Sequence, residues 1–178
     1  MHTYTYDLFA EKIGFKLIWG CIVFYPFFYT LGLHPLVATA TSVTPSVAAA
    51  CGGIFLLGYT LSRGANNQKF AYRVDPARPF LFGLVPQRAV PNSRLLCSGW
   101  WALARHINYF GESLMALGIA LPAALATGSW LPLTYPLYYV ALLVPRALED
   151  GRICAAKYGA AWAEYCRRVP YLIIPGVL

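Results

Sequence analysis

Lys69 and Arg73 are two basic residues spaced four apart, so on a helix they would share one face. Together they could grip a phosphate group through charge-assisted hydrogen bonds. Another interpretation is a basic flank that only fixes the orientation of a neighbouring membrane segment. The spacing by itself leaves both interpretations open.

A second cluster gathers aromatic, cationic, amide and acidic groups into one short stretch of the chain. Its members are Trp100, Arg105, His106, Asn108, Tyr109 and Glu112. Polar groups that enter a bilayer are costly, and they usually face a bundle interior or a cavity. An interfacial aromatic belt and lipid headgroups would explain Trp100 and Arg105. They would leave His106, Asn108 and Glu112 without a role, which favours a binding site here.

A third cluster follows the last long apolar stretch. Arg146 and Asp150 are again four apart and could pair at the mouth of a cavity. Farther along, Tyr158, Trp162 and Tyr165 recur at helical spacing, which is typical of an amphipathic helix lying against a membrane face or covering a site. The competing interpretation is a solvated helix whose exposed ion pairs contribute little stability.

The elements that would carry these clusters belong to a membrane protein. The 178-residue chain is 58% hydrophobic and only 12% charged, whereas soluble domains average about 25% charged residues. Lipid can solvate such an apolar exterior, which in water would need more polar cover. The net charge of +7 could attract nucleic acid. The basic residues are interleaved with apolar segments, however, and no nucleic-acid-binding motif accompanies them, so nucleic acid is not expected as a partner.

Common nucleotide and metal motifs are missing from the sequence. No Gly-x-Gly-x-x-Gly follows a strand, so a Rossmann nucleotide site is not predicted. The five cysteines show no spacing typical of a metal site, and their odd number argues against a closed disulfide set. A nucleotide would therefore be held by Arg and Lys side chains at the membrane surface, and no metal is expected.

Charge and apolar length together predict the topology. The apolar stretches that could cross a bilayer are 13–33, 43–61, 113–127 and 130–145. Every Lys, Arg, Asp and Glu lies in 1–16, in 63–112 or from 146 onward. With four crossings, all three charged regions fall on one side, and their basic excess makes that side cytoplasmic.

The sequence therefore predicts a single all-α membrane domain over 1–178. We expect a polytopic bundle of about four spanning helices plus a C-terminal amphipathic helix. A cytoplasmic loop at 62–112, with little regular structure in its first part, and a cytoplasmic C-terminal segment at 146–178 would carry the polar clusters. Both termini would lie in the cytoplasm.

Four ordered motifs resemble the C-terminal half of the sterol reductase family, which includes the C14, C7 and C24(28) sterol reductases and the lamin B receptor membrane domain. They are the stretch from Phe15 to Tyr29, the Ala-Asn-Asn-Gln-Lys loop that runs to Arg73, the segment from Leu95 to Tyr109, and a run from Arg146 through Asp150 and Lys157-Tyr158-Gly159 to Pro175. The third, Leu-Leu-Cys-Ser-Gly-Trp-Trp-Ala-Leu-Ala-Arg-His-Ile-Asn-Tyr, is the most specific. The resemblance covers nearly the whole chain.

The resemblance implies a multi-helix membrane enzyme of the endoplasmic reticulum or of a bacterial inner membrane. Such an enzyme reduces a carbon–carbon double bond of a sterol or related polycyclic lipid with NADPH. The positions that match the family's cofactor contacts are Lys69, Arg73, Trp100, Arg105, His106, Asn108, Arg146, Asp150 and Tyr158. The candidate proton donors are Asp150, Tyr109 and Tyr29.

The chain departs from the family pattern at three residues and in length. Glu149-Asp150-Gly151 stands where Arg-Asp-Glu is usual, and Glu112 stands where aspartate is usual. Family members are also longer, with several more N-terminal spans that help to wall the sterol cavity. A homo-oligomer or a companion subunit could supply the missing helices. The other expected partners are a sterol-like lipid and membrane lipids.

Two other functions fit part of the pattern. An isoprenylcysteine methyltransferase-like enzyme shares the small helical architecture and an Arg-His turn, and it uses S-adenosylmethionine in place of NADPH. Its turn typically continues with Pro, whereas Ile107 stands here. A non-catalytic membrane subunit or fragment is the remaining hypothesis, and the short chain motivates it.

Overall fold

The computed structural model describes residues 18–38 and 43–177. Regular structure in this part of the chain is helical, apart from two isolated antiparallel bridges that pair Phe80 with Val85 and Ala89 with Leu96. The all-α class predicted from the sequence is confirmed. The beginning of the first predicted span, 13–17, lies outside the described residues.

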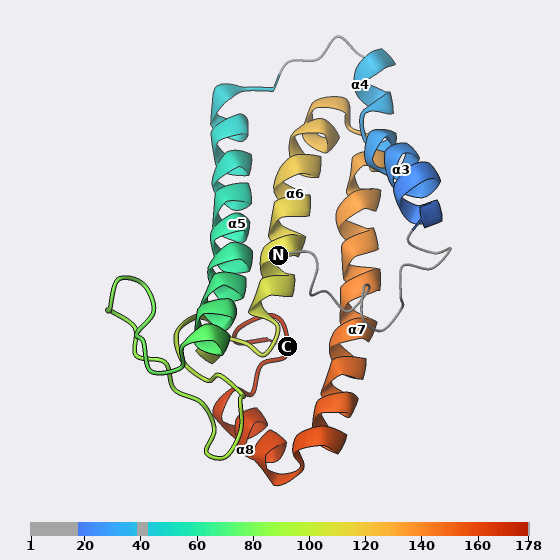
Figure 1. Cartoon of the computed structure of the whole chain (residues 1–178). Coiled ribbons are helices and arrows are strands. Elements are labelled where there is room, and N and C mark those ends of the chain that lie inside the picture. Colours follow the sequence, from blue (N-terminus) through green and yellow to red (C-terminus); the bar gives the residue numbers. More distant parts are fainter. Residues whose placement is uncertain (1–17, 39–42, 178) are drawn as a thin grey trace.

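Three long helices form the body of the structure (Figure 1): α5 (Pro45–Val74), α6 (Ile107–Thr127) and α7 (Thr134–Tyr158). Helix α6 lies in the middle, because it packs against α5 and against α7. The short helices α3 (Tyr25–Leu31) and α4 (His34–Ala38) lie at the end of the bundle where α7 begins, and α8 (Ala160–Arg168) lies at the opposite end.

Among the described helices, α5 and α6 are long and apolar enough to cross a membrane. Helix α5 continues to Val74, so the prediction of a loop from residue 62 is wrong for 62–74. No Gly or Pro stands between Ala65 and Asp75, and the helix ends where Pro76 disfavours the helical conformation of the residue before it. Lys69 and Arg73 therefore lie one turn apart on a helix.

The later helices also differ from their predicted bounds. Helix α6 begins at Ile107 rather than at 113, and α7 runs through Pro145 to Tyr158. The amphipathic helix predicted to carry Tyr158, Trp162 and Tyr165 is divided at Gly159, whose φ of 52° suits a glycine and ends α7. Helix α8 then starts in a new direction and carries Trp162 and Tyr165 back over the end of the bundle.

Helices α5 and α6 approach each other closely through glycines. A Cβ atom on Gly58 would lie 2.6 Å from the carbonyl oxygen of Gly111, and one on Gly111 would lie 2.6 Å from that of Gly58. Small residues allow helix backbones to meet in this way in membrane bundles. One turn along α5, Ser62 Oγ donates a hydrogen bond to Glu112 Oε1 at 2.6 Å, so this carboxylate helps to join the two helices.

The chain segment before α6 is fixed against α5 by a buried glutamine. Gln68 Nε2 donates to Ser98 O at 2.9 Å, and Gln68 Oε1 accepts from Trp100 N at 2.9 Å. The indole Nε1 of Trp101 donates to Ala65 O at 2.8 Å. These bonds set where α6 starts relative to α5, and so they set the position of every side chain on its first turn.

Candidate functional site

A cavity of about 720 Å³ lies at the end of the bundle where α5 and α7 end and α6 begins. Its basic lining residues are Lys69, Arg73, Arg94, Arg105, Arg146 and Lys157. Asp150 is the one acidic side chain among the lining residues that the structure describes. This excess of positive charge suits a ligand with several negative charges, such as the phosphates of a nucleotide. We call this space the cationic cavity.

Aromatic rings hold two of the cations in the cationic cavity. Lys69 Nζ lies 4.5 Å from the centroid of a Trp101 ring, and Lys157 Nζ lies 5.1 Å from that of Tyr158. Such cation–π contacts restrict where the ammonium groups lie. They leave the positive charge itself unneutralised, so both groups remain able to attract an anion.

His106 lies at the boundary between the preceding loop and α6, stacked on Tyr109 with ring centroids 4.8 Å apart. The pKa of His106 is lowered to about 4, chiefly by burial; the Asp150 carboxylate opposes this shift, and the charges of Lys69 and Arg105 contribute to it. The imidazole is therefore neutral at physiological pH. It can offer a hydrogen bond to a ligand but adds no charge to the cavity.

Arg105 is bonded to Cys166 in α8 and to the segment that follows α8. Its Nη1 donates to Cys166 Sγ at 2.9 Å, its Nη2 to Pro170 O at 3.1 Å and its Nε to Tyr171 O at 3.5 Å. Its backbone N also donates to Tyr171 O, at 3.0 Å. The guanidinium thus lines the cationic cavity with three of its N–H groups engaged by the protein.

Tyr109 and Asp150 form a hydrogen-bonded pair across two helices. The Tyr109 hydroxyl, on the first turn of α6, donates to Asp150 Oδ2 on α7 at 3.2 Å. Arg146 lies one turn before Asp150 on α7 and lines the same cavity. A phenol held by a carboxylate in this way is oriented, and such a group can take part in proton transfer.

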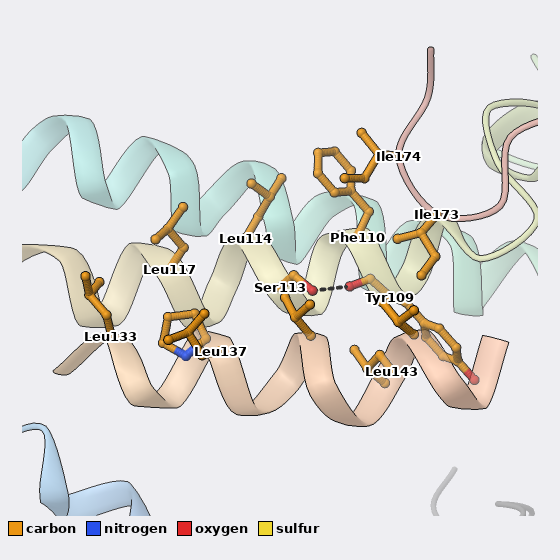
Figure 2. A pocket seen from close by; sticks show the side chains of 13 residues that line it. Tyr109, Phe110, Ser113, Leu114, Leu117, Leu133, Leu137, Leu143, Ile173 and Ile174 are labelled. Carbon is orange, nitrogen blue, oxygen red and sulfur yellow. Dashed lines mark hydrogen bonds between the residues drawn. The ribbon is translucent and has the colours of Figure 1, made fainter. Parts of the chain in front are cut away.

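A second cavity, of about 480 Å³, runs between α6 and α7 (Figure 2). Its lining is almost wholly apolar: Tyr109, Phe110, Ser113, Leu114, Leu117, Leu133, Pro136, Leu137, Val140, Leu143, Val144, Ile173 and Ile174. The Ser113 hydroxyl donates a hydrogen bond to the Tyr109 carbonyl oxygen at 3.0 Å, so the serine side chain is satisfied within its own helix. We call this space the apolar cavity, and its lining suits a lipid.

Tyr109 lines both cavities, alone among the lining residues that the structure describes. It belongs to the wall of the apolar cavity, and its hydroxyl bonds to Asp150, which lines the cationic cavity. A polar reactant in one cavity and an apolar reactant in the other would therefore meet at this side chain.

Most of the residues that the resemblance assigned to the cofactor line the cationic cavity. They are Lys69, Arg73, Arg105, His106, Arg146, Asp150 and Tyr158. Trp100 instead packs on the cluster that includes Leu61 and Ala65. Asn108 Nδ2 donates to Asn66 Oδ1 at 3.4 Å, and its own Oδ1 is buried with no hydrogen-bond partner among the described residues. Tyr29 belongs to α3, and its side chain lies outside the described part of the structure.

Sequence reasoning did not assign a binding role to Arg94, Lys157, Trp162 or Tyr165, all of which line the cationic cavity. Lys157, Trp162 and Tyr165 stand in a motif whose spacing already indicated a helix near a site. Arg94 stands in a loop without any pattern, and only the folding of 75–98 brings it there. Within the described residues, no group of three or more His, Cys, Asp or Glu side chains is placed to hold a metal ion.

Comparison with known proteins gives relatives over nearly the whole chain. The model of the ergosterol biosynthesis ERG4/ERG24 family matches residues 3–178. The Delta(14)-sterol reductase TM7SF2 of Mus musculus is 40% identical over 173 residues, which are 97% of this chain and 41% of that protein. The Delta(14)-sterol reductase of Arabidopsis thaliana is 39% identical over 176 residues, 98% of this chain and 46% of the relative.

A bacterial relative has a similar identity to this chain and a similar coverage. The Delta(14)-sterol reductase of Methylotuvimicrobium alcaliphilum is 40% identical over 175 residues, 97% of this chain and 40% of that protein. The chain therefore spans less than half the length of these curated relatives, and it aligns to their C-terminal part. The family predicted from the sequence motifs is confirmed.

Proposed function

Because the chain belongs to the ergosterol biosynthesis ERG4/ERG24 family, we propose that it catalyses NADPH-dependent reduction of a carbon–carbon double bond in a sterol or a related polycyclic lipid. The observation that carries the proposal is the position of Tyr109, on the wall that the cationic and apolar cavities share. A nucleotide in the first cavity and an apolar lipid in the second would bring their reacting atoms to the same side chain.

The cationic cavity has the donor set that NADPH requires. A pyrophosphate and a 2′-phosphate carry several negative charges, and Lys69, Arg73, Arg94 and Lys157 offer cationic donors from three separate parts of the chain. Trp162 and Tyr158 supply aromatic surface in the same cavity, on which a flat ring can stack. Bound NADPH would supply a hydride to one carbon of the double bond.

The other carbon of the double bond needs a proton, and the Tyr109 hydroxyl is the proposed donor. Its hydrogen bond to Asp150 at 3.2 Å holds the phenol oxygen where the two cavities meet, and the hydroxyl would turn from Asp150 to the substrate carbon as it gives up its proton. Asp150, on the cationic side, would orient the phenol and help to return a proton to it after each turnover. Tyr29 remains a predicted alternative donor.

The apolar cavity would receive the lipid from the membrane. Leucine, isoleucine, valine and proline side chains dominate its wall, so it offers little hydrogen bonding to water and suits a fused hydrocarbon ring system. Excluding water beside Tyr109 would also strengthen the electrostatic contacts of the reacting groups.

The proposed setting is a multi-pass protein of the endoplasmic reticulum or a bacterial inner membrane, with α7 and the segment that contains α3 crossing the bilayer as well as α5 and α6. The charged side chains described on α5 and α7 gather at one end of the bundle, and the described connections 32–33 and 128–133 at the other end carry none. The charged end, which holds the cationic cavity, would face the cytoplasm.

The test is isotope transfer in a reconstituted system. The purified protein in lipid nanodiscs is incubated with a panel of unsaturated sterols and NADPH that carries deuterium at C4, in ordinary water. Mass spectrometry should find one deuterium in the saturated product, and unlabelled NADPH in D₂O should place one deuterium at the other carbon. No reduced product and no NADPH binding would refute the proposal, and binding of S-adenosylmethionine in its place would favour the methyltransferase hypothesis.

A further inference from the structure

The last turn of α8 and the segment after it are attached to the start of α6 by hydrogen bonds from both backbone and side-chain donors. Arg105 N donates to Tyr171 O at 3.0 Å, and His106 N donates to Leu172 O at 2.8 Å. The Arg105 guanidinium adds bonds to Pro170 O at 3.1 Å and Cys166 Sγ at 2.9 Å. This attachment fixes the segment in both position and direction.

The two residues that follow the attached carbonyls form part of the wall of the apolar cavity. Ile173 and Ile174 come next in the chain and line that cavity together with Tyr109 and Phe110. Figure 2 shows them at the Tyr109 end, far from Leu133 at the other end. Ile173 is only 6% exposed, so its position is set by packing as well as by the chain.

From this arrangement we propose that Ile173 and Ile174 select the lipid substrate at the reacting end of the apolar cavity, and that Arg105 acts as a positioning residue that holds them there. The proposal rests on the proposed function, since it takes the apolar cavity as the lipid site. Isoleucine is branched at Cβ and has few rotamers, so it forms a wall of fixed shape. A wall next to Tyr109 decides which substituents beside the double bond can be accommodated.

The proposal gives Arg105 a role different from that of Lys69 and Arg73. Those two residues reach the cationic cavity from α5, whereas three N–H groups of Arg105 are engaged by residues 166–171. Loss of the Arg105 guanidinium should therefore change the preference between sterols more than it changes the affinity for NADPH. Loss of the Arg73 charge should weaken NADPH binding more than it changes the preference between sterols.

The experiment compares two unsaturated sterols that differ only by a methyl group next to the reacting double bond. Ile174→Val and Ile174→Ala enlarge the cavity at the Tyr109 end, and Leu133→Ala is the matched control because it enlarges the other end. We expect the Ile174 variants to change the ratio of kcat/KM for the two sterols by about tenfold in favour of the bulkier one. Leu133→Ala should leave this ratio unchanged, and NADPH affinity should be unchanged in all three variants.

Arg105→Lys tests the positioning role, with Arg73→Gln measured beside it. We expect Arg105→Lys to shift the sterol ratio in the same direction as Ile174→Val and to raise the Kd for NADPH less than Arg73→Gln does. An unchanged sterol ratio in the Ile174 variants would overturn the proposal, as would a loss of NADPH affinity in Arg105→Lys equal to that of Arg73→Gln.

The same comparison separates this proposal from the proposed function. Equilibrium binding of the two sterols to the wild-type protein and to Ile174→Val, measured in nanodiscs, requires no turnover. A wild-type protein that reduces neither sterol refutes the reductase function, and the binding ratio still decides the role of Ile174. Unaltered binding preference in Ile174→Val would then overturn the role assigned to the wall.

Discussion

The cationic cavity and the apolar cavity meet at Tyr109, yet they are built in different ways. The cationic cavity draws its basic side chains from α5, the loop before α6, and α7, which are three separate parts of the sequence. The apolar cavity is formed mainly by the facing sides of two successive helices, α6 and α7. A few charges define the first, so single substitutions should act strongly on it. Shape defines the second, so its wall should respond to changes in side-chain volume.

The largest effect is expected at the junction of the two cavities. Tyr109→Phe removes the hydroxyl that donates to Asp150 and leaves the ring in both walls. Loss of a general acid should lower kcat by roughly 10²–10⁴-fold, while the Kd values for NADPH and sterol stay close to wild type. Tyr139→Phe is the matched control, because Tyr139 lies on α7 and lines neither cavity. Full activity in Tyr109→Phe would move the proton donor elsewhere, with Tyr29 the next candidate.

A smaller effect, confined to the cationic cavity, is expected from Arg73→Gln. Loss of one charge-assisted phosphate contact should raise the Kd for NADPH by about tenfold to a hundredfold. Affinity for sterol should not change. The difference in NADPH Kd between the wild type and Arg73→Gln should become smaller at high salt. Arg63→Gln serves as control, because Arg63 is an exposed arginine of α5 that lines neither cavity. Equal losses in both variants would mean that only the general positive charge matters.

The converse effect, confined to the apolar cavity, is expected from Leu117→Trp. The larger ring would occupy space between α6 and α7 and should raise the KM for sterol by about tenfold. Titration should show NADPH affinity unchanged. Leu125→Trp, at an exposed position of the same helix outside both cavities, should leave sterol KM unchanged. A sterol KM unaffected by Leu117→Trp would place the lipid outside this cavity.

The smallest effect concerns stability rather than activity and reports how dry the site is beside Tyr109. Burial lowers the pKa of His106 to about 4, whereas the pKa of histidine in an unfolded chain is about 6.5. The unfolded chain then binds more protons, so the fold loses stability as the pH falls through this window, by roughly 3 kcal/mol at its lower end. Melting temperatures from pH 7 to pH 4 should therefore fall more for the wild type than for His106→Gln. Parallel curves would mean that His106 is well solvated.

The charged site was largely predictable from the sequence because its chemistry is tied to residue type. Lys69 and Arg73 at helical spacing, and the cluster around His106, mark positions where charge and polarity need a reason in an apolar chain. The same reasoning could not separate Asn108, which bonds to Asn66, from the residues that line the cavity. The direction of each side chain on the first turn of α6 depends on how Gln68 and Trp101 fix the preceding loop against α5. These tertiary contacts cannot be read from the sequence pattern.

The apolar cavity was not predictable in the same way. Its leucines and isoleucines have the residue types of any lipid-facing or packed position, so the sequence does not distinguish them. Ile173 and Ile174 are brought to the wall by packing and by the hydrogen bonds of Arg105 and His106 to the two residues before them, neither of which a residue pattern shows. The observed bounds of α5 also differ from the predicted ones, because the helix extends through a polar stretch that contains no helix-breaking residue.

The most direct test of the account is a structure of the protein in lipid with NADPH and a saturated sterol product bound together. We expect the phosphates of NADPH to lie among Lys69, Arg73 and Arg94. We expect the sterol to lie between α6 and α7, with a ring carbon beside the Tyr109 hydroxyl. NADPH bound outside the cationic cavity, or a sterol whose rings lie away from Tyr109, would contradict it.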